Sequence, residues 1–412
     1  MSNNNKTPAI RFKGFIDAWE QRKLGDIADI VGGGTPSTGN PSYWDGDIDW
    51  YAPAEIANQI YANSSQKKIT DLGYENSSAK MLPPGTVLFT SRAGIGKTAI
   101  LTRKGCTNQG FQSIVPHRGE LDTYFIFSRT EELKRYGELV GAGSTFVEVS
   151  GKQMAVMELI MPPTMREQQT IGGFFQQLDH LITLHQRKYD KLIQFKAAML
   201  QKMFPQNGAD KPEIRFKGFT DAWEQRKLGE ISESFEYGLN AAATEYDGKH
   251  KYIRITDIDD STHLFLQDDL TSPDIDFSTA DDYLLQEGDI LFARTGASVG
   301  KTYIYRRSDG DLYFAGFLIR AKIKSDYDAD FVFQNTLTDS YDSYIRITSQ
   351  RSGQPGVNAQ EYANFALSVP SLAEQKKIGA YFSHLDTLIT LHQRKCDKYK
   401  SIKAGLIRKL FP

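Results

Sequence analysis

The sequence contains little cysteine and no long apolar run. Only two of its 412 residues are cysteines, Cys106 and Cys396. Two cysteines so far apart provide no disulfide framework, which favours a reducing compartment and a cytoplasmic location. No run of about eighteen apolar residues occurs, so no membrane span is expected. The first fifteen residues, MSNNNKTPAIRFKGF, lack an apolar segment of signal-peptide length.

The sequence also lacks a large excess of charge of either sign. Its formal net charge is −2, which argues against a protein that coats nucleic acid without specificity. The charges are unevenly distributed, however. Residues 232–373 carry 23 Asp and Glu against 12 Lys and Arg, whereas residues 374–412 carry nine Lys and Arg against three Asp and Glu. Any nucleic-acid contact in the acidic stretch therefore requires a local basic patch or a basic partner.

Recognisable catalytic or metal-binding patterns are missing. No His/Cys cluster has metal-ligand spacing. Residues 40–43, Asn-Pro-Ser-Tyr, resemble the Asn-Pro-Pro-Tyr motif of adenine N6 methyltransferases, but the second proline is absent and a turn-rich loop accounts for the segment. The Gly-Lys-Thr triplets at 96–98 and 300–302 lack the earlier glycine of a phosphate-binding loop, and apolar strands rather than helices follow them.

The chain instead consists of two tandem halves. Residues 11–27 (RFKGFIDAWEQRKLGDI) and 215–231 (RFKGFTDAWEQRKLGEI) differ at only two positions. A second repeat relates residues 167–205 to residues 374–412, and both copies contain the string LITLHQRK. Such repeats must be recognised before a fold is assigned. A short, turn-rich linker, residues 206–214, joins the two halves.

Residues 167–205 and 374–412 are each predicted to form one long helix. Apolar residues recur at steps of three and four, and neither copy contains an internal proline. Each helix would be about 58 Å long, so it requires a partner, and the other copy is the obvious one. We therefore predict an antiparallel coiled coil. The expected pairing residues are Ile171, Phe175, Leu178, Ile182, His185, Leu192, Ile378, Phe382, Leu385, Ile389, His392 and Leu406.

The variable regions, about 28–160 and 232–370, are predicted to be α+β and mainly β. Each contains a turn, an apolar strand, a Gly-rich loop and a further strand, and short helices are expected within 125–136 and 331–347. If the helices pair antiparallel, an approximate two-fold axis relates the two regions. Dimeric DNA-binding proteins have this symmetry, and two unlike regions would contact two unlike half-sites.

As a set, these features resemble the specificity subunit of type I restriction-modification systems. The resemblance rests on the alternation of variable region and repeated helix, the AWEQRKLG blocks, the EQ…LD.LI.LHQRK helices and the opening GGGTPSTGNPSYWDGDIDW at 32–50. It implies target recognition domains at 1–166 and 215–373, separated by the helices at 167–205 and 374–412. It also implies that the helices fix the spacing of a bipartite, asymmetric DNA target.

The resemblance further implies a non-catalytic chain that binds double-stranded DNA and two methyltransferase subunits, which a restriction subunit can join. S-adenosylmethionine, ATP and Mg²⁺ are expected on those partner subunits only. Two alternatives remain: an adenine N6 methyltransferase or fused nuclease acting through Asn40–Tyr43, and a coiled-coil scaffold with no DNA role.

Loop residues with basic, amide or hydroxyl side chains are candidates for DNA contacts, because such groups bind phosphates and base edges. Solvated loop polarity is the competing interpretation for all of them. The candidates are Arg92, Lys97, Thr98, Asn108, Gln109, Ser144, Thr145, Arg294, Lys301, Thr302, Gln350, Arg351 and Gln354.

Overall fold

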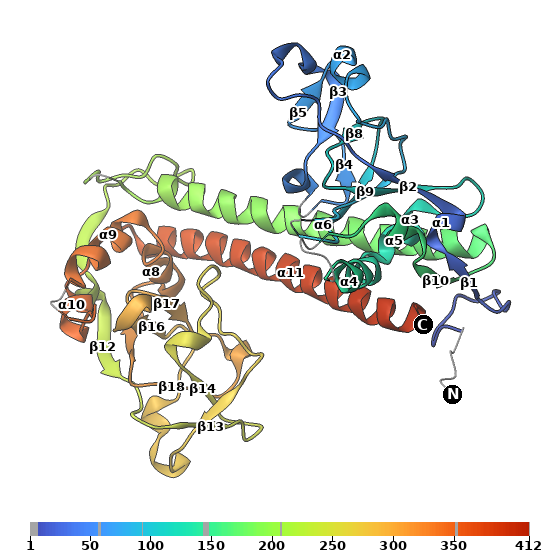
Figure 1. The fold of residues 1–412 in the computed structure, drawn as a ribbon. Coiled ribbons are helices and arrows are strands. Elements are labelled where there is room, and N and C mark those ends of the chain that lie inside the picture. The colour runs from blue at the N-terminus through green and yellow to red at the C-terminus, as the bar shows by residue number, and fades with distance from the viewer. Residues whose placement is uncertain are drawn as a thin grey trace. The chain divides into compact units, whose positions relative to one another are not determined.

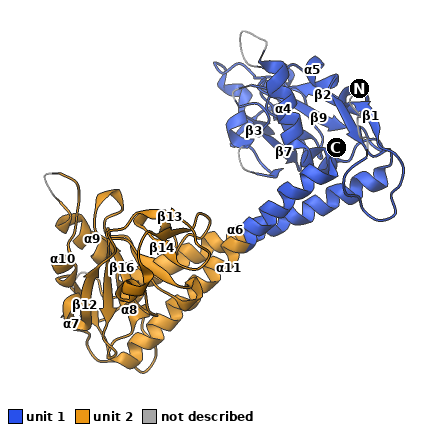
Figure 2. Cartoon of the chain, turned by 90° about the horizontal axis from the view of Figure 1, so that it is seen from below, with its two compact units in different colours: residues 1–184, 395–412 blue, residues 185–394 orange. Residues whose placement is uncertain are grey.

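A computed structural model describes residues 7–56, 59–92, 94–142, 148–206, 208–350 and 353–411. The chain forms two compact units, shown in different colours in Figure 2. Unit 1 comprises residues 1–184 and 395–412, and unit 2 comprises residues 185–394. Each unit therefore combines one variable region with part of each long helix. The domain boundaries predicted from the sequence, at 166 and 373, separate each variable region from the long helix that follows it. These boundaries remain predictions.

Unit 1 is built around a five-stranded sheet in the order β2-β9-β6-β7-β4, beside a three-stranded sheet in the order β5-β3-β8. Strands β1 and β10 pair antiparallel and join the repeat block to the end of the variable region. The elements are β1 (Glu20–Lys23), α1 (Leu24–Ile27), β2 (Ala28–Gly32), β3 (Trp44–Tyr51), β4 (Tyr61–Ala62), β5 (Lys67–Ile69), α2 (Asp71–Glu75), β6 (Val87–Phe89), β7 (Thr98–Leu101), β8 (Cys106–Thr107), β9 (Gln112–Pro116), α3 (Thr123–Ser128), α4 (Thr130–Gly141), α5 (Gly151–Ala155) and β10 (Glu158–Met161).

Unit 2 repeats this plan with a four-stranded sheet in the order β12-β19-β16-β17. Strands β11 and β20 pair antiparallel as β1 and β10 do, and short pairs β13-β15 and β14-β18 extend the domain. The elements are β11 (Glu224–Lys227), α7 (Leu228–Ile231), β12 (Ser232–Tyr237), β13 (Ala243–Glu245), β14 (Lys251–Ile253), β15 (Thr271–Pro273), β16 (Ile290–Ala293), β17 (Thr302–Ile304), β18 (Leu312–Phe314), β19 (Leu318–Ile323), α8 (Ala329–Asn335), α9 (Asp339–Thr348), α10 (Ala359–Ala363) and β20 (Ala366–Val369).

The two long helices are α6 (Met165–Met203) and α11 (Leu372–Leu410), each beginning and ending two residues earlier than the repeats predict. They lie side by side in Figure 1. In unit 1, Lys403 Nζ contacts Asp179 Oδ1 at 2.6 Å. In unit 2, Lys196 Nζ contacts Asp386 Oδ1 at the same distance. Moving along α6 from Asp179 to Lys196, the contacted residue of α11 moves backward from Lys403 to Asp386. The helices therefore pair antiparallel within each unit.

Most of the residues predicted to pair the helices are buried or half-buried. In unit 1, Ile171, Phe175 and Leu178 belong to the main hydrophobic core, with Leu406 packed against it. In unit 2, the same holds for Ile378, Phe382 and Leu385, with Leu192 packed against the core. Ile389 is buried and Ile182 is half-buried. These residues therefore bind the helices to the recognition domains as well as to each other.

His185 and His392 meet directly in unit 2. Their Nδ1 atoms are 2.8 Å apart, and the ring centroids are 5.0 Å apart. One Nδ1 must donate and the other accept, because a hydrogen bond needs a single proton between the two nitrogens. Among the described residues, no group of three or more His, Cys, Asp and Glu is arranged to hold a metal ion.

The Phe-Pro sequence that follows each long helix completes a hydrophobic core. Phe411, after α11, packs in unit 1 against Phe125 and Phe175, with ring centroids 5.7 and 5.9 Å away. Phe204, after α6, packs in unit 2 against Phe331 and Trp223, at 5.5 and 6.1 Å. Each core thus contains an aromatic ring supplied by the end of the helix that begins in the other half of the sequence.

A buried ion pair links each repeat block to the start of a long helix. In unit 1, Arg11 Nε and Nη2 each donate to Glu167 at 2.7 Å. In unit 2, Arg215 donates to Glu374 in the same bidentate way, at 2.7 and 2.8 Å. The two glutamate side chains are only 2% and 1% exposed.

The glutamine next to each of these glutamates fastens the long helix to the recognition domain. Gln168 Oε1 accepts from Asp122 N, and Gln375 Oε1 accepts from Asp328 N, both at 3.0 Å. The two aspartates are the N-caps of α3 and α8. The repeated Glu-Gln pair therefore joins three segments at the same place in each unit.

The predicted fold class is confirmed: two α+β regions are combined with two long antiparallel helices. Short helices occur where they were expected, as α3 and α4 in unit 1 and as α8 and α9 in unit 2. None of the helices in the described ranges is long and apolar enough to cross a membrane.

We expect Glu374→Ala to destabilise unit 2 by about 3 kcal/mol, because it leaves the half-buried Arg215 guanidinium without its carboxylate. Hydrogen exchange resolved by mass spectrometry reports the opening of each unit separately. Glu213→Ala is the matched control, since the Lys202–Glu213 pair is exposed and is expected to contribute less than about 1 kcal/mol. Equal effects of the two substitutions would contradict the anchoring role of Glu374.

Candidate nucleic-acid interface

Several candidate residues lie in the loop that follows β6 in unit 1 or β16 in unit 2, both interior strands of their sheets. In unit 1, Ser91 follows β6, and its N–H donates to Gly110 O at 2.8 Å. On its other side, Val149 N donates to Ser91 O at 3.0 Å. The chain at Ser91 is therefore held between two further segments, which fixes the backbone at this position.

Unit 2 repeats these hydrogen bonds around Arg294. Its N–H donates to Phe317 O at 3.0 Å, and its carbonyl accepts from Val357 N at 2.9 Å. Arg294 is thus the structural equivalent of Ser91, and Phe317 is the equivalent of Gly110. Two segments with little sequence identity adopt the same backbone frame.

Arg92 and Arg294, grouped in the sequence as matching loop residues, are not equivalent. Arg92 forms a backbone bridge with Glu148, and the corresponding bridge of unit 2 joins Thr295 to Gly356. The two arginines are therefore offset by one residue. Adjacent residues of an extended chain point to opposite faces, so the arginines face different surroundings in the two units.

The threonines of the two Gly-Lys-Thr triplets hold the sheet to the helices. Thr302 is fully buried, and its hydroxyl lies 2.7 Å from Thr336 Oγ1. In unit 1, the half-buried Thr98 makes the same contact with Thr130, at 2.8 Å. This placement argues against the predicted DNA contacts of Thr98 and Thr302, because both hydroxyls are already engaged inside the domain.

The lysines of the two triplets differ from each other. Lys97 is exposed, as a loop-tip cation would be. Lys301 is 11% exposed and forms an ion pair with Asp260, while its Nζ donates to Ile258 O at 2.9 Å. A DNA contact by Lys301 would require breaking these bonds. Of the two lysines, Lys97 is the one whose side chain is exposed to solvent and accessible to DNA.

The amide candidates of unit 1 lie beside Arg92. Asn108 is half-buried, and its Oδ1 accepts from Gly110 N at 2.8 Å. Gln109 is exposed, and its Oε1 accepts from the Thr35 hydroxyl. Because Gln109 uses its oxygen in this way, its NH₂ group is the end available to an acceptor. Asn108 shapes the turn and Gln109 presents a donor.

Three of the candidates, Ser144, Thr145 and Arg351, fall outside the described residues. Gln350 is exposed and lies two residues after the end of α9. Gln354 is also exposed, and its Nε2 lies over Gly296, 3.1 Å from where a Cβ on that glycine would be. Gly296 has a φ of +77°, so its lack of a side chain permits both the turn and the close approach of Gln354.

Arg294 and Gln354, predicted from separate loops, line the same cleft. Its volume is about 840 Å³. The other walls come from residues 237–241, from Arg254 and from the turn at residues 315–317. Arg254 is held by a bidentate pair with Asp257, at 2.8 Å for both bonds, and this hydrogen bonding raises the pKa of the Arg254 guanidinium. Unit 2 therefore has a polar and aromatic cleft beside the loop that follows β16.

Comparison with known proteins identifies this architecture. The family model for the type I restriction modification DNA specificity domain matches residues 16–194 and 220–400. The chain belongs to this family. It is the specificity subunit of a type I restriction-modification system, with two tandem specificity domains.

Curated relatives agree with this family assignment. The chain is 31% identical over 297 residues to the type I restriction enzyme MjaIX specificity subunit of Methanocaldococcus jannaschii, covering 68% of this chain and 67% of that protein. It is 26% identical over 190 residues to the EcoR124I/EcoR124II specificity subunit of Escherichia coli, covering 42% of this chain and 46% of that one.

A solved structure shares the fold. The type I restriction-modification S subunit from M. genitalium superimposes with a TM-score of 0.67 at 16% identity, covering 98% of this chain and 99% of that one. The similarity of the folds therefore extends over nearly the full length of both chains.

The segment that resembles a methyltransferase motif forms a turn in the first specificity domain. Asn40 caps a short 3-10 helix at Pro41–Tyr43. Its Oδ1 accepts from Ser42 N at 3.1 Å and from Ser42 Oγ at 2.8 Å. The side-chain carbonyl that would have to accept the amine of a target base is thus used within the turn.

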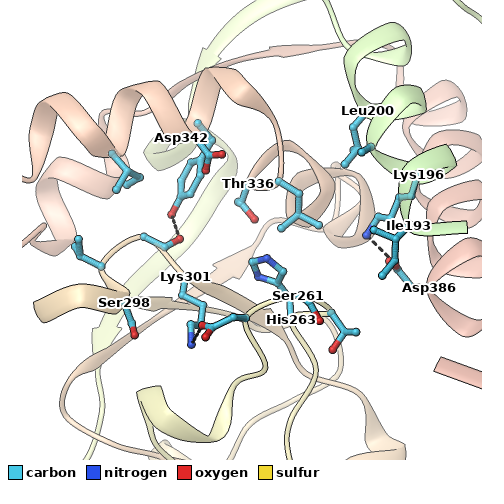
Figure 3. Close-up of a pocket in the computed structure, with 18 of the residues that line it drawn as sticks. Ile193, Lys196, Leu200, Ser261, His263, Ser298, Lys301, Thr336, Asp342 and Asp386 are labelled. Carbon is cyan, nitrogen blue, oxygen red and sulfur yellow. Dashed lines mark hydrogen bonds and ion pairs between the residues drawn. The ribbon is translucent and has the colours of Figure 1, made fainter. Parts of the chain in front are cut away.

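A second cleft of about 840 Å³ lies in unit 2, between α6, α9, α11 and the loop at residues 260–263 (Figure 3). His263 lies on its wall with a φ of +57°, and its Nδ1 is 2.8 Å from Thr302 O. Burial lowers the pKa of His263. Lys196 and Asp386, also in this wall, pair with each other.

Sequence reasoning missed two aromatic residues at the first cleft. Tyr237, at the end of β12, and Phe317, in the β18–β19 turn, are 44% and 62% exposed. An exposed aromatic residue has no periodic signature in a short strand or turn. The one available signal was the position of Phe317 directly after a glycine between two apolar strands.

We expect Thr302→Val to destabilise unit 2 by about 1 kcal/mol, because it removes a buried hydrogen bond. Base preference of the assembled complex should remain unchanged. Thermal or urea unfolding measures the first effect, and methylation of a duplex library measures the second. Thr387→Val, at an exposed position of α11, is the control. A changed target sequence in Thr302→Val would show that its hydroxyl reaches DNA after all.

We expect acid to weaken unit 2 through His263. Below about pH 6.5, the ordinary pKa of histidine, the unfolded chain binds a proton more readily than the folded one, so stability falls as pH falls. His263→Asn cannot titrate and tolerates a positive φ, and should lose less stability between pH 7 and 5. Thr387→Val, which removes no titratable group from an exposed position, should keep the wild-type slope. Identical slopes for wild type and both variants would contradict the assignment.

Proposed function

We propose that each specificity domain reads one half of a bipartite, asymmetric DNA target. The single observation that supports this most directly is the shared backbone frame around Ser91 and Arg294. The frame is the same in both domains, whereas the side chains displayed on it differ. Duplicated frames with unlike side chains are what two half-sites of different sequence require.

The proposed mechanism is positioning rather than catalysis. Bound methyltransferase subunits flip and methylate adenine, since a base inside a duplex cannot reach an active site. We propose two such subunits per chain and a restriction subunit that joins them. In this proposal, S-adenosylmethionine, ATP and Mg²⁺ are bound by the partners.

The charge distribution supports a dependence on partners. Residues 232–373 carry 23 acidic against 12 basic residues, so this part of the chain is poorly suited to neutralise phosphates by itself. Basic surface contributed by the methyltransferase subunits would provide most of the phosphate contacts. The specificity subunit would then supply the base contacts that select the sequence.

We expect that exchanging residues 28–160 for the variable region of another specificity subunit changes one half of the methylated sequence only. The measurement is methylome sequencing of a host that expresses the chimera with its modification subunits. The reciprocal exchange of residues 232–370 is the matched control and should change the other half.

The purified chain alone should transfer no methyl group from S-adenosylmethionine to DNA. Methyl transfer by the isolated chain would support the methyltransferase alternative. An unchanged methylome after both exchanges would support a scaffold without a DNA role.

A further inference from the structure

The cleft in unit 2 around Arg294 has the features of a site built to read bases. The backbone of Arg294 is fixed from both sides, by Phe317 O and by Val357 N. Its guanidinium carbon lies 5.0 Å from the ring centroid of Tyr237, and its Nη1 lies 3.4 Å from Gly316 O. The arginine is half-buried, so its orientation is set before any ligand arrives.

Tyr237 is itself held in place. Its hydroxyl accepts from Ala359 N at 3.2 Å, at the start of α10. A guanidinium stacked on an aromatic ring keeps its N–H groups in one plane, directed outward from the edge of the stack. With Nη1 directed to Gly316 O, the restrained guanidinium carries further N–H donors in the same plane. A pair of such donors matches the O6 and N7 acceptors of guanine.

Phe317 completes the cleft with an apolar contact. It is 62% exposed at the tip of the turn between β18 and β19, where Leu318 N donates to Ala315 O at 2.8 Å. Its carbonyl is the group bonded to Arg294 N, so the two residues are held side by side. In the major groove, the group that an apolar side chain recognises is the thymine methyl.

We propose, resting on the proposed function, that Arg294 stacked on Tyr237 reads a guanine in the second half-site and that Phe317 contacts the methyl group of a neighbouring thymine. The equivalent positions of unit 1 are Ser91, which is buried, and Gly110. Neither has a side chain able to make these contacts. This particular pair of contacts is therefore proposed for the second half-site.

The test uses the full chain assembled with its modification subunits. The wild-type target is first determined from a randomised duplex library by sequencing of methylated products. Arg294→Lys keeps the charge but loses the planar fork. We expect this substitution to reduce the preference for guanine over the other three bases, at the position that Arg294 reads in the second half-site, by about 5- to 150-fold. Arg307→Lys, at an exposed position outside the cleft, is the matched control and should behave as wild type.

The Phe317 contact has its own probe, replacement of thymine by deoxyuracil in the second half-site. Loss of the methyl group should reduce wild-type methylation by about fourfold, from roughly 0.8 kcal/mol per apolar carbon. Phe317→Ala should not distinguish thymine from deoxyuracil. In Arg294→Lys and in Phe317→Ala, the sequence requirement at the first half-site should stay unchanged. This result would show that both variants fold and assemble.

Two results would overturn the inference while leaving the proposed function intact. One is a wild-type second half-site without any G·C pair. The other is unchanged base preference at every position of that half-site in Arg294→Lys and Phe317→Ala. By contrast, a wild-type complex that methylates without any sequence preference would refute the proposed function itself.

Discussion

The structure depends on a carboxylate buried at the start of each long helix. Glu167 and Glu374 are almost completely removed from water, and a buried charge is tolerated only when it is fully paired. The bidentate arginines of the two repeat blocks provide that pairing. Each junction fixes where the repeat block, the helix and the recognition domain meet, and the rest of the unit packs around it.

This constraint explains why the repeated segments resemble each other and the variable regions do not. A bidentate pair permits little change in either partner, because the planar guanidinium and the carboxylate must match in geometry. The neighbouring glutamines bond to backbone groups, among them the N–H of the N-cap residue of α3 or α8, which any residue except proline supplies. The junction can therefore hold recognition domains of different sequence without being redesigned.

The extent of the long helices and the duplication could be predicted from the sequence, because helical periodicity and repeats are local properties. The helix ends were displaced by only two residues. The alignment of the two variable regions could not be predicted. Arg92 and Arg294 follow similar sequence patterns, but the register of their strands is set by hydrogen bonds to distant segments. A shift of one residue then changes the face of the sheet on which a side chain lies.

The candidate site was predictable only in part for the same reason. Thr302 carries a hydroxyl that could contact a ligand from a loop, yet this hydroxyl is hydrogen-bonded to Thr336 inside the domain. Phe317 looks like a core residue, yet the turn leaves most of its ring in solvent. Burial is a property of the tertiary fold, and in short strands and turns the sequence carries little information about it.

The aromatic residues that follow the long helices determine the order in which the protein is completed during synthesis. The core of unit 2 includes Phe204 and needs no residue beyond 394. The core of unit 1 includes Leu410 and Phe411. A ribosome makes the first recognition domain early, but that domain acquires its last core residues only after the whole of unit 2 has been translated. The half that is made first is thus the half that finishes folding last, and its incomplete core stays exposed to chaperones and proteases throughout the intervening time.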